Sequence, residues 1–199
     1  ITITSSTYLV TYGDRLYEKF QFLFSRLEKK KLKDTFQGIQ GTKRDIGIFG
    51  FHRIGFHVLR AIQKTGHSYL VVDHNPETVA DLQKRDVPAL FGDVSSVEFL
   101  SEFDFKDMTL LISTIPTYSV NKKLLQNYRA QNKDGVCVLT AEHHHEAMQL
   151  YEQGADYVIV PQHLGGNHIE ALIHDFHTNE HRFLIERIRH LEELRHKPF

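Results

Sequence analysis

From Asp45 onward the sequence alternates between short apolar runs and longer stretches with helical spacing, and this alternation limits the possible folds more than any other feature. Six β-branched, apolar runs predict strands, at 46–49, 69–72, 87–91, 109–113, 136–140 and 157–160. The segments between them predict helices, at 54–63, 77–85, 96–103, 120–132 and 142–153. Connections of helical length force parallel pairing, and continuous apolar runs indicate strands buried on both faces. We therefore expect a doubly wound, parallel α/β sheet.

The composition is ordinary for a folded domain. The chain has 199 residues, 41% hydrophobic and 25% charged, which suits one domain with appendages. The formal net charge of −1, with 14 histidines counted as neutral, argues against a nucleic-acid partner, because such domains usually carry a basic excess. The single cysteine, Cys137, lies in an apolar run, so no intrachain disulfide can form and a reducing, cytosolic setting fits.

Residues 1–44 have a different character from the rest of the chain. Residues 1–12 are moderately apolar but fall short of the roughly 20 residues that a membrane-spanning helix needs. Residues 14–44 carry nine Lys or Arg against four Asp or Glu, and residues 34–44 have the composition of a linker. Aromatic residues followed by lysines are typical of the cytoplasmic side of a membrane helix, and the chain opens at Ile1, so we expect a piece cut from a longer membrane protein. The alternative is an amphipathic surface helix with solvated lysines.

The first predicted strand runs into a glycine-bounded turn and then a helix. In a dinucleotide-binding turn, the first glycine allows a tight turn, the second admits the pyrophosphate and the third lets helix and strand pack closely. Gly50 and Gly55 occupy the outer positions, and His52 stands where the middle glycine belongs. The helix start still favours an anion, so His52 either donates to a phosphate or closes the site.

An acidic residue follows the second predicted strand. Asp73 comes eighteen residues after Gly55, close to the spacing at which a carboxylate accepts hydrogen bonds from a ribose diol and repels a 2′-phosphate. The pattern thus favours NAD or AMP-type ligands over NADP. The alternative is that Asp73 and Asn75 form only a turn and cap the helix that opens at Pro76.

Taken in order, five segments of the chain resemble the RCK or TrkA-N domain over roughly residues 45–175. These segments are IFGFHRIG, VVDHNPE, FGDVSSVEFL, LISTIPTYSVNKKLL and LTAEHHHEAMQLYEQGADYVIVP. The last one is especially similar to the version attached to Kef-type cation/proton antiporters, and residues 1–20 resemble the end of the last membrane helix of such antiporters.

The resemblance implies a Rossmann-like sheet with strand order 3-2-1-4-5-6, an adenine nucleotide at the carboxyl ends of the strands, and dimerisation. It places Gly50, Arg53 and Gly55 along the phosphate turn and Asp73 at the ribose. It also places Asp93 beside the adenine, and Ser113 and Thr114 at the edge of the site after the fourth strand.

Asp93, Ser113 and Thr114 can each have a purely structural role as an alternative. Asp93 or Ser95 can cap the helix that follows, and Ser113 and Thr114 can be hydrogen bonders at a strand end.

The three adjacent histidines, His143 to His145, cannot all chelate one ion from a regular helix, because neighbouring residues point about 100° apart. No metal site is therefore expected there.

Two apolar stripes follow the sixth strand. Ile169, Leu172, Ile173 and Phe176 form the first, and Phe183, Leu184, Ile188 and Leu191 form the second, after a polar break at 177–182. The first stripe can cover the sheet of its own domain. The second has no further sheet to cover, so we expect residues 166–199 to form a helical segment for homodimerisation.

The expected organisation is thus a juxtamembrane segment at 1–44, a nucleotide-binding domain at 45–165 and a helical segment at 166–199. The expected function is regulation of a covalently linked monovalent-cation transport domain by NAD(H), AMP or ADP, without catalysis. An alternative function is that of a gating-ring domain of a potassium channel, which differs from the antiporter domain only in the residues that precede Ile1. An NAD-dependent oxidoreductase is disfavoured, because no stretch of the chain is left for a substrate domain.

Overall fold

The computed structural model describes residues 44–51, 54–174 and 182–195. The chain divides into two compact units, 1–43 and 44–199, and every described residue belongs to the second. None of the helices in these described ranges is both long enough and apolar enough to cross a lipid bilayer. The expectations for the membrane-helix end and the basic stretch in 1–43 lie outside the described residues.

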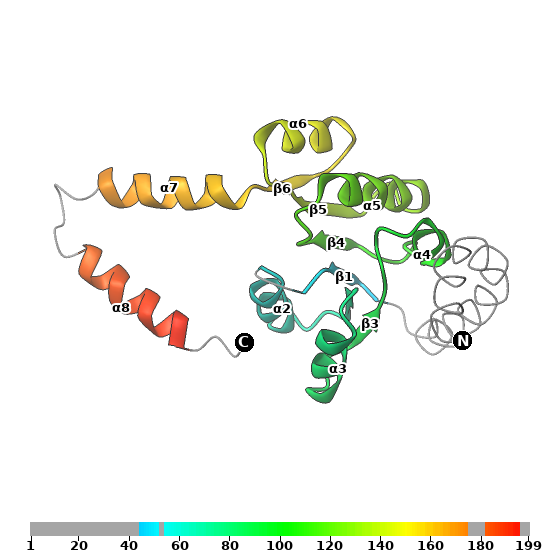
Figure 1. Cartoon of the computed structure of the whole chain (residues 1–199), viewed down its shortest axis with the longest axis horizontal. Coiled ribbons are helices and arrows are strands. Elements are labelled where there is room, and N and C mark those ends of the chain that lie inside the picture. Colours follow the sequence, from blue (N-terminus) through cyan, green and yellow to red (C-terminus); the bar gives the residue numbers. More distant parts are fainter. Residues whose placement is uncertain (1–43, 52–53, 175–181, 196–199) are drawn as a thin grey trace, which may run out of the picture. The chain divides into compact units, whose positions relative to one another are not determined.

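Six parallel strands form one sheet in the order β3-β2-β1-β4-β5-β6 (Figure 1). The strands are β1 (Ile46–Phe49), β2 (Tyr69–Asp73), β3 (Ala89–Phe91), β4 (Leu110–Ser113), β5 (Val136–Thr140) and β6 (Tyr157–Ile159). At the centre of the sheet, Ile48 of β1 lies opposite Val71 of β2 on one side and Ile112 of β4 on the other. The doubly wound, Rossmann-like fold and its strand order are confirmed.

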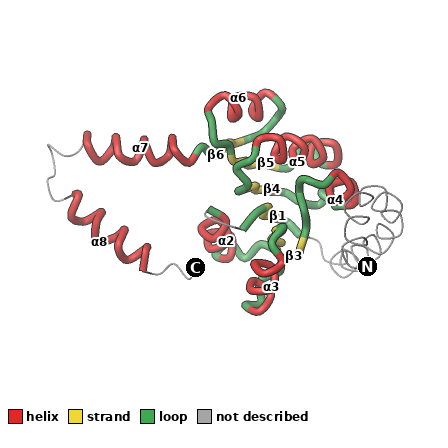
Figure 2. The backbone as a smooth tube through the Cα atoms, in the orientation of Figure 1, coloured by secondary structure: helices red, strands yellow, loops and turns green. Residues whose placement is uncertain are grey.

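A helix connects each strand to the next, and helices lie on both sides of the sheet (Figure 2). They are α2 (Gly55–Gln63), α3 (Pro76–Lys84), α4 (Val97–Glu102), α5 (Tyr118–Gln131) and α6 (His144–Glu152), followed by α7 (Pro161–His174) and α8 (Arg182–Arg195). Right-handed crossovers place α2 and α3 on one face and α4, α5 and α6 on the other, because the chain changes direction along the sheet after β3. The change leaves a crevice between the carboxyl ends of β1 and β4.

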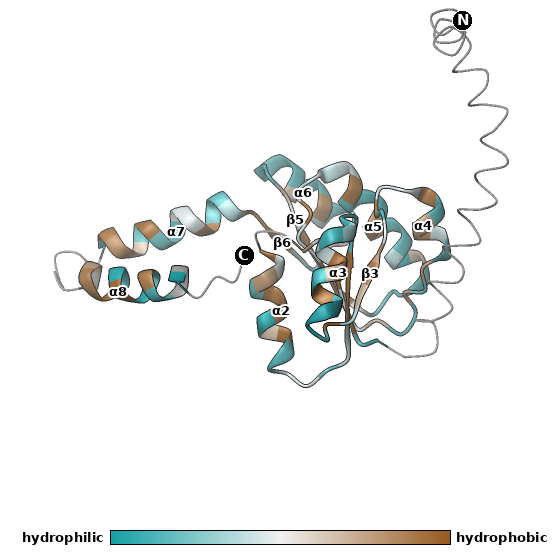
Figure 3. Cartoon of the chain, turned by 60° about the horizontal axis from the view of Figure 1, so that its bottom comes forward, coloured by the Kyte–Doolittle hydropathy of each residue, from teal (hydrophilic) through white to brown (hydrophobic). Residues whose placement is uncertain are grey.

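The core consists of the strands and an aromatic cluster beneath α4 and α5. The strands are coloured mainly as hydrophobic in Figure 3, and Ile48, Val71 and Leu111 are fully buried. In the aromatic cluster, the rings of Phe103 and Phe105 lie 4.7 Å apart and Tyr128 meets Phe105 edge-on at 5.9 Å. This packing holds α4 and α5 against the sheet and so fixes the helices that border the crevice.

Most element boundaries lie within one or two residues of the sequence expectation, and two of the differences have clear physical reasons. β3 begins at Ala89 rather than at residue 87, because Pro88 has no N–H to donate to the neighbouring strand. α7 begins at Pro161, well before Ile169, the first residue of the apolar stripe. Proline favours the first position of a helix. The Gly165-Gly166 pair interrupts the apolar spacing, so the sequence pattern does not reveal the first turns of this helix.

Candidate functional site

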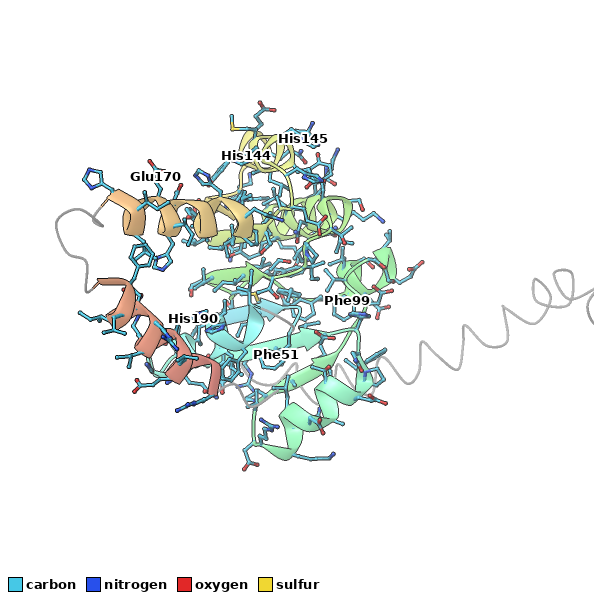
Figure 4. The ribbon with its side chains drawn as sticks, turned by 60° about the vertical axis from the view of Figure 1, so that its left-hand side comes forward. Phe51, Phe99, His144, His145, Glu170 and His190 are labelled. Carbon is cyan, nitrogen blue, oxygen red and sulfur yellow. The ribbon has the colours of Figure 1, made fainter. Side chains whose placement is uncertain are left out.

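A cavity of about 280 Å³ opens at the carboxyl ends of β1, β2, β3 and β4. Its walls come from the ends of these strands and the residues after them: Gly50 and Phe51; Val72, Asp73 and His74; Gly92, Asp93, Val94 and Ser95; and Thr114, Ile115, Pro116, Thr117 and Val120. Figure 4 labels Phe51, which follows β1, and Phe99 of α4, whose ring a Cβ on Gly92 would meet. The cavity lies at the point where the strand order reverses, which is where doubly wound sheets bind ligands.

The turn after β1 depends on both outer glycines. Gly50 has φ +85°, and a Cβ on it would lie 2.8 Å from Cγ1 of Ile115. A Cβ on Gly55 would lie 2.8 Å from the carbonyl oxygen of Gly50, so the helix start could not approach the turn so closely with any larger residue. The remaining expected turn residues, His52 and Arg53, lie outside the described residues.

Asp73 is the buried acid of the site, with only 6% of its surface exposed. Its Oδ2 accepts a hydrogen bond from the Phe51 N–H at 2.5 Å, and its Oδ1 accepts one from the Asn75 N–H at 2.8 Å. The Nδ1 of His74 lies 3.5 Å from the same Oδ1. Each carboxylate oxygen has two acceptor sites, so Asp73 keeps capacity for a ligand hydroxyl while it joins the ends of β1 and β2.

Asn75 has the capping role that the sequence left open for it. Its Oδ1 accepts a hydrogen bond from the Glu77 N–H at 2.9 Å, and Pro76 occupies the first turn of α3. Asp73 contributes to this turn through the Asn75 N–H, but it also lines the cavity. Asp73 therefore has a structural role in the turn and also lies on the cavity wall.

Asp93 is the second acid of the cavity, and its side chain is exposed. Its Oδ1 accepts hydrogen bonds from the Ser95 hydroxyl at 2.7 Å and the Ser95 N–H at 2.8 Å. The Ser95 hydroxyl holds the pKa of Asp93 below its ordinary value of 3.8, and His74 and Lys123 lower it further. The alternative that Asp93 or Ser95 caps α4 is wrong: the cap is Ser96, whose hydroxyl accepts from the Phe99 N–H at 3.2 Å.

Thr114 and Ser113 have different positions, although they are neighbours. Thr114 lines the cavity, and its hydroxyl donates to the carbonyl oxygen of Gly50 at 2.8 Å. Ser113 is fully buried behind the cavity wall, and its hydroxyl donates to Oδ1 of Asn121 at 2.6 Å. Both are thus hydrogen bonders at a strand end, as one interpretation of the sequence expects. Of the predicted site residues, Gly50, Asp73, Asp93 and Thr114 line the cavity, and Gly55 and Ser113 support it from behind.

Three residues near the cavity were not singled out from the sequence. His74 is at its rim with a mostly exposed ring. Lys123 extends from α5 to the Ser95 carbonyl oxygen at 3.4 Å. Asn121 is buried on α5, at helical spacing from Leu124, Leu125 and Tyr128. A polar residue on the apolar face of a predicted helix was the available signal for Asn121.

The histidines at the start of α6 do not converge on one point. Figure 4 shows His144 and His145 at this helix start. The rings of His143 and His145 stack 5.6 Å apart, whereas the ring of His144 meets His163 of α7 edge-on at 5.2 Å. In the described ranges no group of three or more His, Cys, Asp or Glu side chains is placed to hold a metal ion.

Comparison with known proteins gives a family model, the TrkA-N domain, that matches residues 46–161. The glutathione-regulated potassium-efflux system protein KefC of Klebsiella pneumoniae is 27% identical over 110 residues, which are 54% of this chain and 18% of that protein. The putative cation/proton antiporter YbaL of Escherichia coli is 23% identical over 149 residues, which are 73% of this chain and 27% of that protein. The chain therefore spans less than a third of the length of either relative.

Solved structures show the same fold. The TrkA-N domain of YbaL from Escherichia coli superposes with a TM-score of 0.61 at 21% identity, covering 66% of this chain and 97% of that one. The Kef C-terminal domain of Shewanella denitrificans in its AMP-bound form has a TM-score of 0.57 at 19% identity, covering 75% and 90%. The GsuK channel bound to NAD has a TM-score of 0.52 at 20% identity, covering 60% and 22%. With its parallel sheet, its crevice at the strand reversal and a family model matching residues 46–161, this chain belongs to the TrkA-N domain family.

Proposed function

We propose that this domain binds an adenine nucleotide, AMP, ADP or NAD(H), in the cavity between β1 and β4, and that binding regulates a monovalent-cation transporter. The observation that carries the proposal is the buried Asp73 carboxylate at the end of β2, which lines the cavity beside the glycine turn. A ribose diol supplies the two hydroxyl donors that such a carboxylate accepts. The AMP-bound Kef domain and the NAD-bound GsuK channel, which share this fold, support the choice of ligand.

Each site residue has a distinct proposed role. Gly50, Arg53 and Gly55 form the phosphate turn, and His52 contacts or limits the phosphates. Asp73 binds the ribose, and Asp93, which is exposed, lies beside the adenine. Thr114 closes the cavity on the β4 side, and Ser113 holds that wall from behind.

The charges of the cavity favour a ligand without a 2′-phosphate. The described lining residues include two carboxylates, Asp73 and Asp93, but no lysine or arginine. A 2′-phosphate beside the ribose would face Asp73 without a counter-charge from these residues, so NADP(H) is disfavoured. We infer that the nucleotide is a regulatory ligand and that the domain catalyses no reaction.

The transport role is proposed from the relatives. KefC is a potassium-efflux protein and YbaL a putative cation/proton antiporter, and this chain matches a minor part of each. We propose that the domain at 45–165 lies at the cytoplasmic face of a membrane, that residues 1–44 connect it to a transport domain of an antiporter, and that nucleotide binding changes ion transport through this connection.

Homodimerisation is proposed through residues 166–199. Ile169 and Ile173 of α7 are more than half exposed, whereas Leu172 is buried, so the first stripe is only partly covered. The second stripe on α8 is exposed at every position, with 42–53% of Phe183, Leu184, Ile188 and Leu191 accessible. Hydrophobic residues lie along both helices in Figure 3. The last predicted member of the first stripe, Phe176, lies outside the described residues.

Thermal shift and calorimetry on the purified chain test the nucleotide proposal. AMP, ADP and NAD(H) are expected to raise the unfolding temperature, and NADP(H) is expected to raise it much less at the same concentration. Equal stabilisation by NADP(H) would remove the ribose role from Asp73. Absence of stabilisation by every adenine nucleotide would refute the proposed function.

A further inference from the structure

A buried polar cluster lies directly behind the cavity wall. Asn121 of α5 and Ser113 of β4 are fully buried, and Thr140 of β5 is 2% exposed. Oδ1 of Asn121 accepts from the Ser113 hydroxyl at 2.6 Å, and its Nδ2 donates to the carbonyl oxygens of Ile115 at 2.7 Å and Thr140 at 2.6 Å. The Thr140 hydroxyl donates to the Ser113 carbonyl oxygen at 2.8 Å, which closes the cluster.

Packing alone does not require an asparagine at this position. The other buried positions on this face of α5 are Leu124, Leu125 and Tyr128, and a leucine would satisfy an apolar contact there. The three hydrogen bonds of the carboxamide go to residues outside its own helix: to the end of β4, the loop after β4 and the end of β5. A fully bonded side chain of this kind specifies one arrangement of the backbone segments that it joins.

The segment that Asn121 holds is one wall of the cavity. The loop from Thr114 to Thr117 lines the cavity, and Asn121 binds its second residue, Ile115, through the carbonyl oxygen. The side chain of Ile115 reaches the glycine turn, since its Cγ1 would lie 2.8 Å from a Cβ on Gly50. Thr114 reaches the same turn through its hydrogen bond to the Gly50 carbonyl oxygen.

We infer that Asn121 is a positioning residue for the nucleotide site: it sets the distance between the loop after β4 and the glycine turn, and it ties that loop to the end of β5. Asn121 does not line the cavity and touches no ligand; it acts through Ile115 and Thr114. The inference rests on the proposed nucleotide site. The hydrogen bond to Thr140 also links the loop after β4 to the segment that leads into α6.

Three variants of the full chain test the inference by calorimetric titration with AMP. Asn121→Ala removes all three bonds and is expected to raise the Kd for AMP by about tenfold or more. Ser113→Ala keeps both amide donors of Asn121 and is expected to raise it about threefold. Tyr128→Phe is the matched control, because Tyr128 is also fully buried on α5 but donates to the Met108 carbonyl oxygen, which precedes β4 at the far end of the strands. It is expected to lower the unfolding temperature and to leave the Kd within about twofold.

Amide hydrogen exchange on the ligand-free proteins separates this inference from the proposed function. Faster exchange confined to residues 114–120 in Asn121→Ala, and absent there in Tyr128→Phe, supports the positioning role even when the parent protein binds no AMP. Unchanged exchange at 114–120, or an AMP Kd that changes equally in Asn121→Ala and Tyr128→Phe, overturns it. If Asn121→Ala does not fold, the same two readouts on Ser113→Ala decide the question.

Discussion

The N–H of Phe51, in the turn after β1, donates to the carboxylate of Asp73, at the end of β2, across 2.5 Å. The same carboxylate accepts the N–H of Asn75 at 2.8 Å and lines the cavity. One buried side chain thus holds the glycine turn in place and faces the proposed ribose. Stability of the ligand-free domain and affinity for the nucleotide are therefore expected to depend on the same residue.

Replacing Asp73 with asparagine tests this shared role. In Asp73→Asn an amide NH2 group faces a backbone N–H, so one buried donor loses its partner, and the free energy of unfolding is expected to fall by about 1–3 kcal/mol. The Kd for AMP or NAD is expected to rise at least about tenfold. Urea denaturation and calorimetry measure the two effects. Asp81→Asn, which changes an exposed carboxylate paired with Lys84, is the control and is expected to change neither by much.

Gly50 and Gly66 form a matched pair for the glycine turn. Both have positive φ, +85° and +74°, but a Cβ on Gly66 meets nothing within 4 Å, whereas one on Gly50 meets Ile115. Gly66→Ala is expected to lower the free energy of unfolding by about 1–2 kcal/mol and to leave nucleotide affinity unchanged. Gly50→Ala is expected to lower it by about 2–4 kcal/mol and to abolish binding. Equal behaviour of the two variants would show that the turn is not part of the site.

Cys137 provides a reporter of folding within the sheet. The thiol is fully buried on β5, and burial raises its pKa to about 12. Because the thiolate is the reactive form, the folded protein is expected to remain unlabelled by a thiol-specific disulfide reagent at pH 8. Full labelling is expected in urea, where the chain's single cysteine is exposed. Rapid labelling of the folded protein would show that β5 opens.

The acid titration of Asp93 has a defined direction. Its pKa in the folded protein is lowered below 3.8, first by the Ser95 hydroxyl, so its ionised form stabilises the fold above that pH. This contribution is lost as the pH falls through the lowered folded-state pKa. Carboxyl-carbon NMR titration is expected to place the Asp93 pKa below 3.8 in the parent protein and nearer to 3.8 in Ser95→Ala. An unchanged pKa in Ser95→Ala would contradict the assignment.

Assembly is tested by removing the second apolar stripe. A chain that ends after Thr178 lacks α8 and is expected to be monomeric by light scattering, with nucleotide affinity largely intact, because none of the described residues that line the cavity lies on α8. Ile188→Glu, a change at a 53% exposed position, is expected to give the same result without a truncation. A full-length chain that remains monomeric at high concentration would refute dimerisation through this stripe.

Local patterns were enough to predict a doubly wound parallel sheet, whereas the strand order came from the family resemblance. A buried parallel strand must be apolar on both faces, and the helices that connect such strands are long enough to show the helical spacing of apolar residues. Both patterns can therefore be recognised within short stretches of consecutive residues. The glycine turn and Asp73 were predicted for the same reason: each lies directly after a strand, at a spacing that the crossover sets. The assignment to the TrkA-N domain also rested on such local segments.

Only the tertiary structure decided which side chains lie beside one another across the crevice. Asp73 meets Phe51, Thr114 meets Gly50 and Asn121 meets Thr140 across separations of 19 to 64 residues in the sequence. Hydrogen bonds between residues so far apart depend on strand register and helix rotation, which composition and periodicity do not specify. Ser113 shows the limit most clearly: the family resemblance placed it at the edge of the site, and only the structure shows that its hydroxyl donates to Oδ1 of Asn121 on α5.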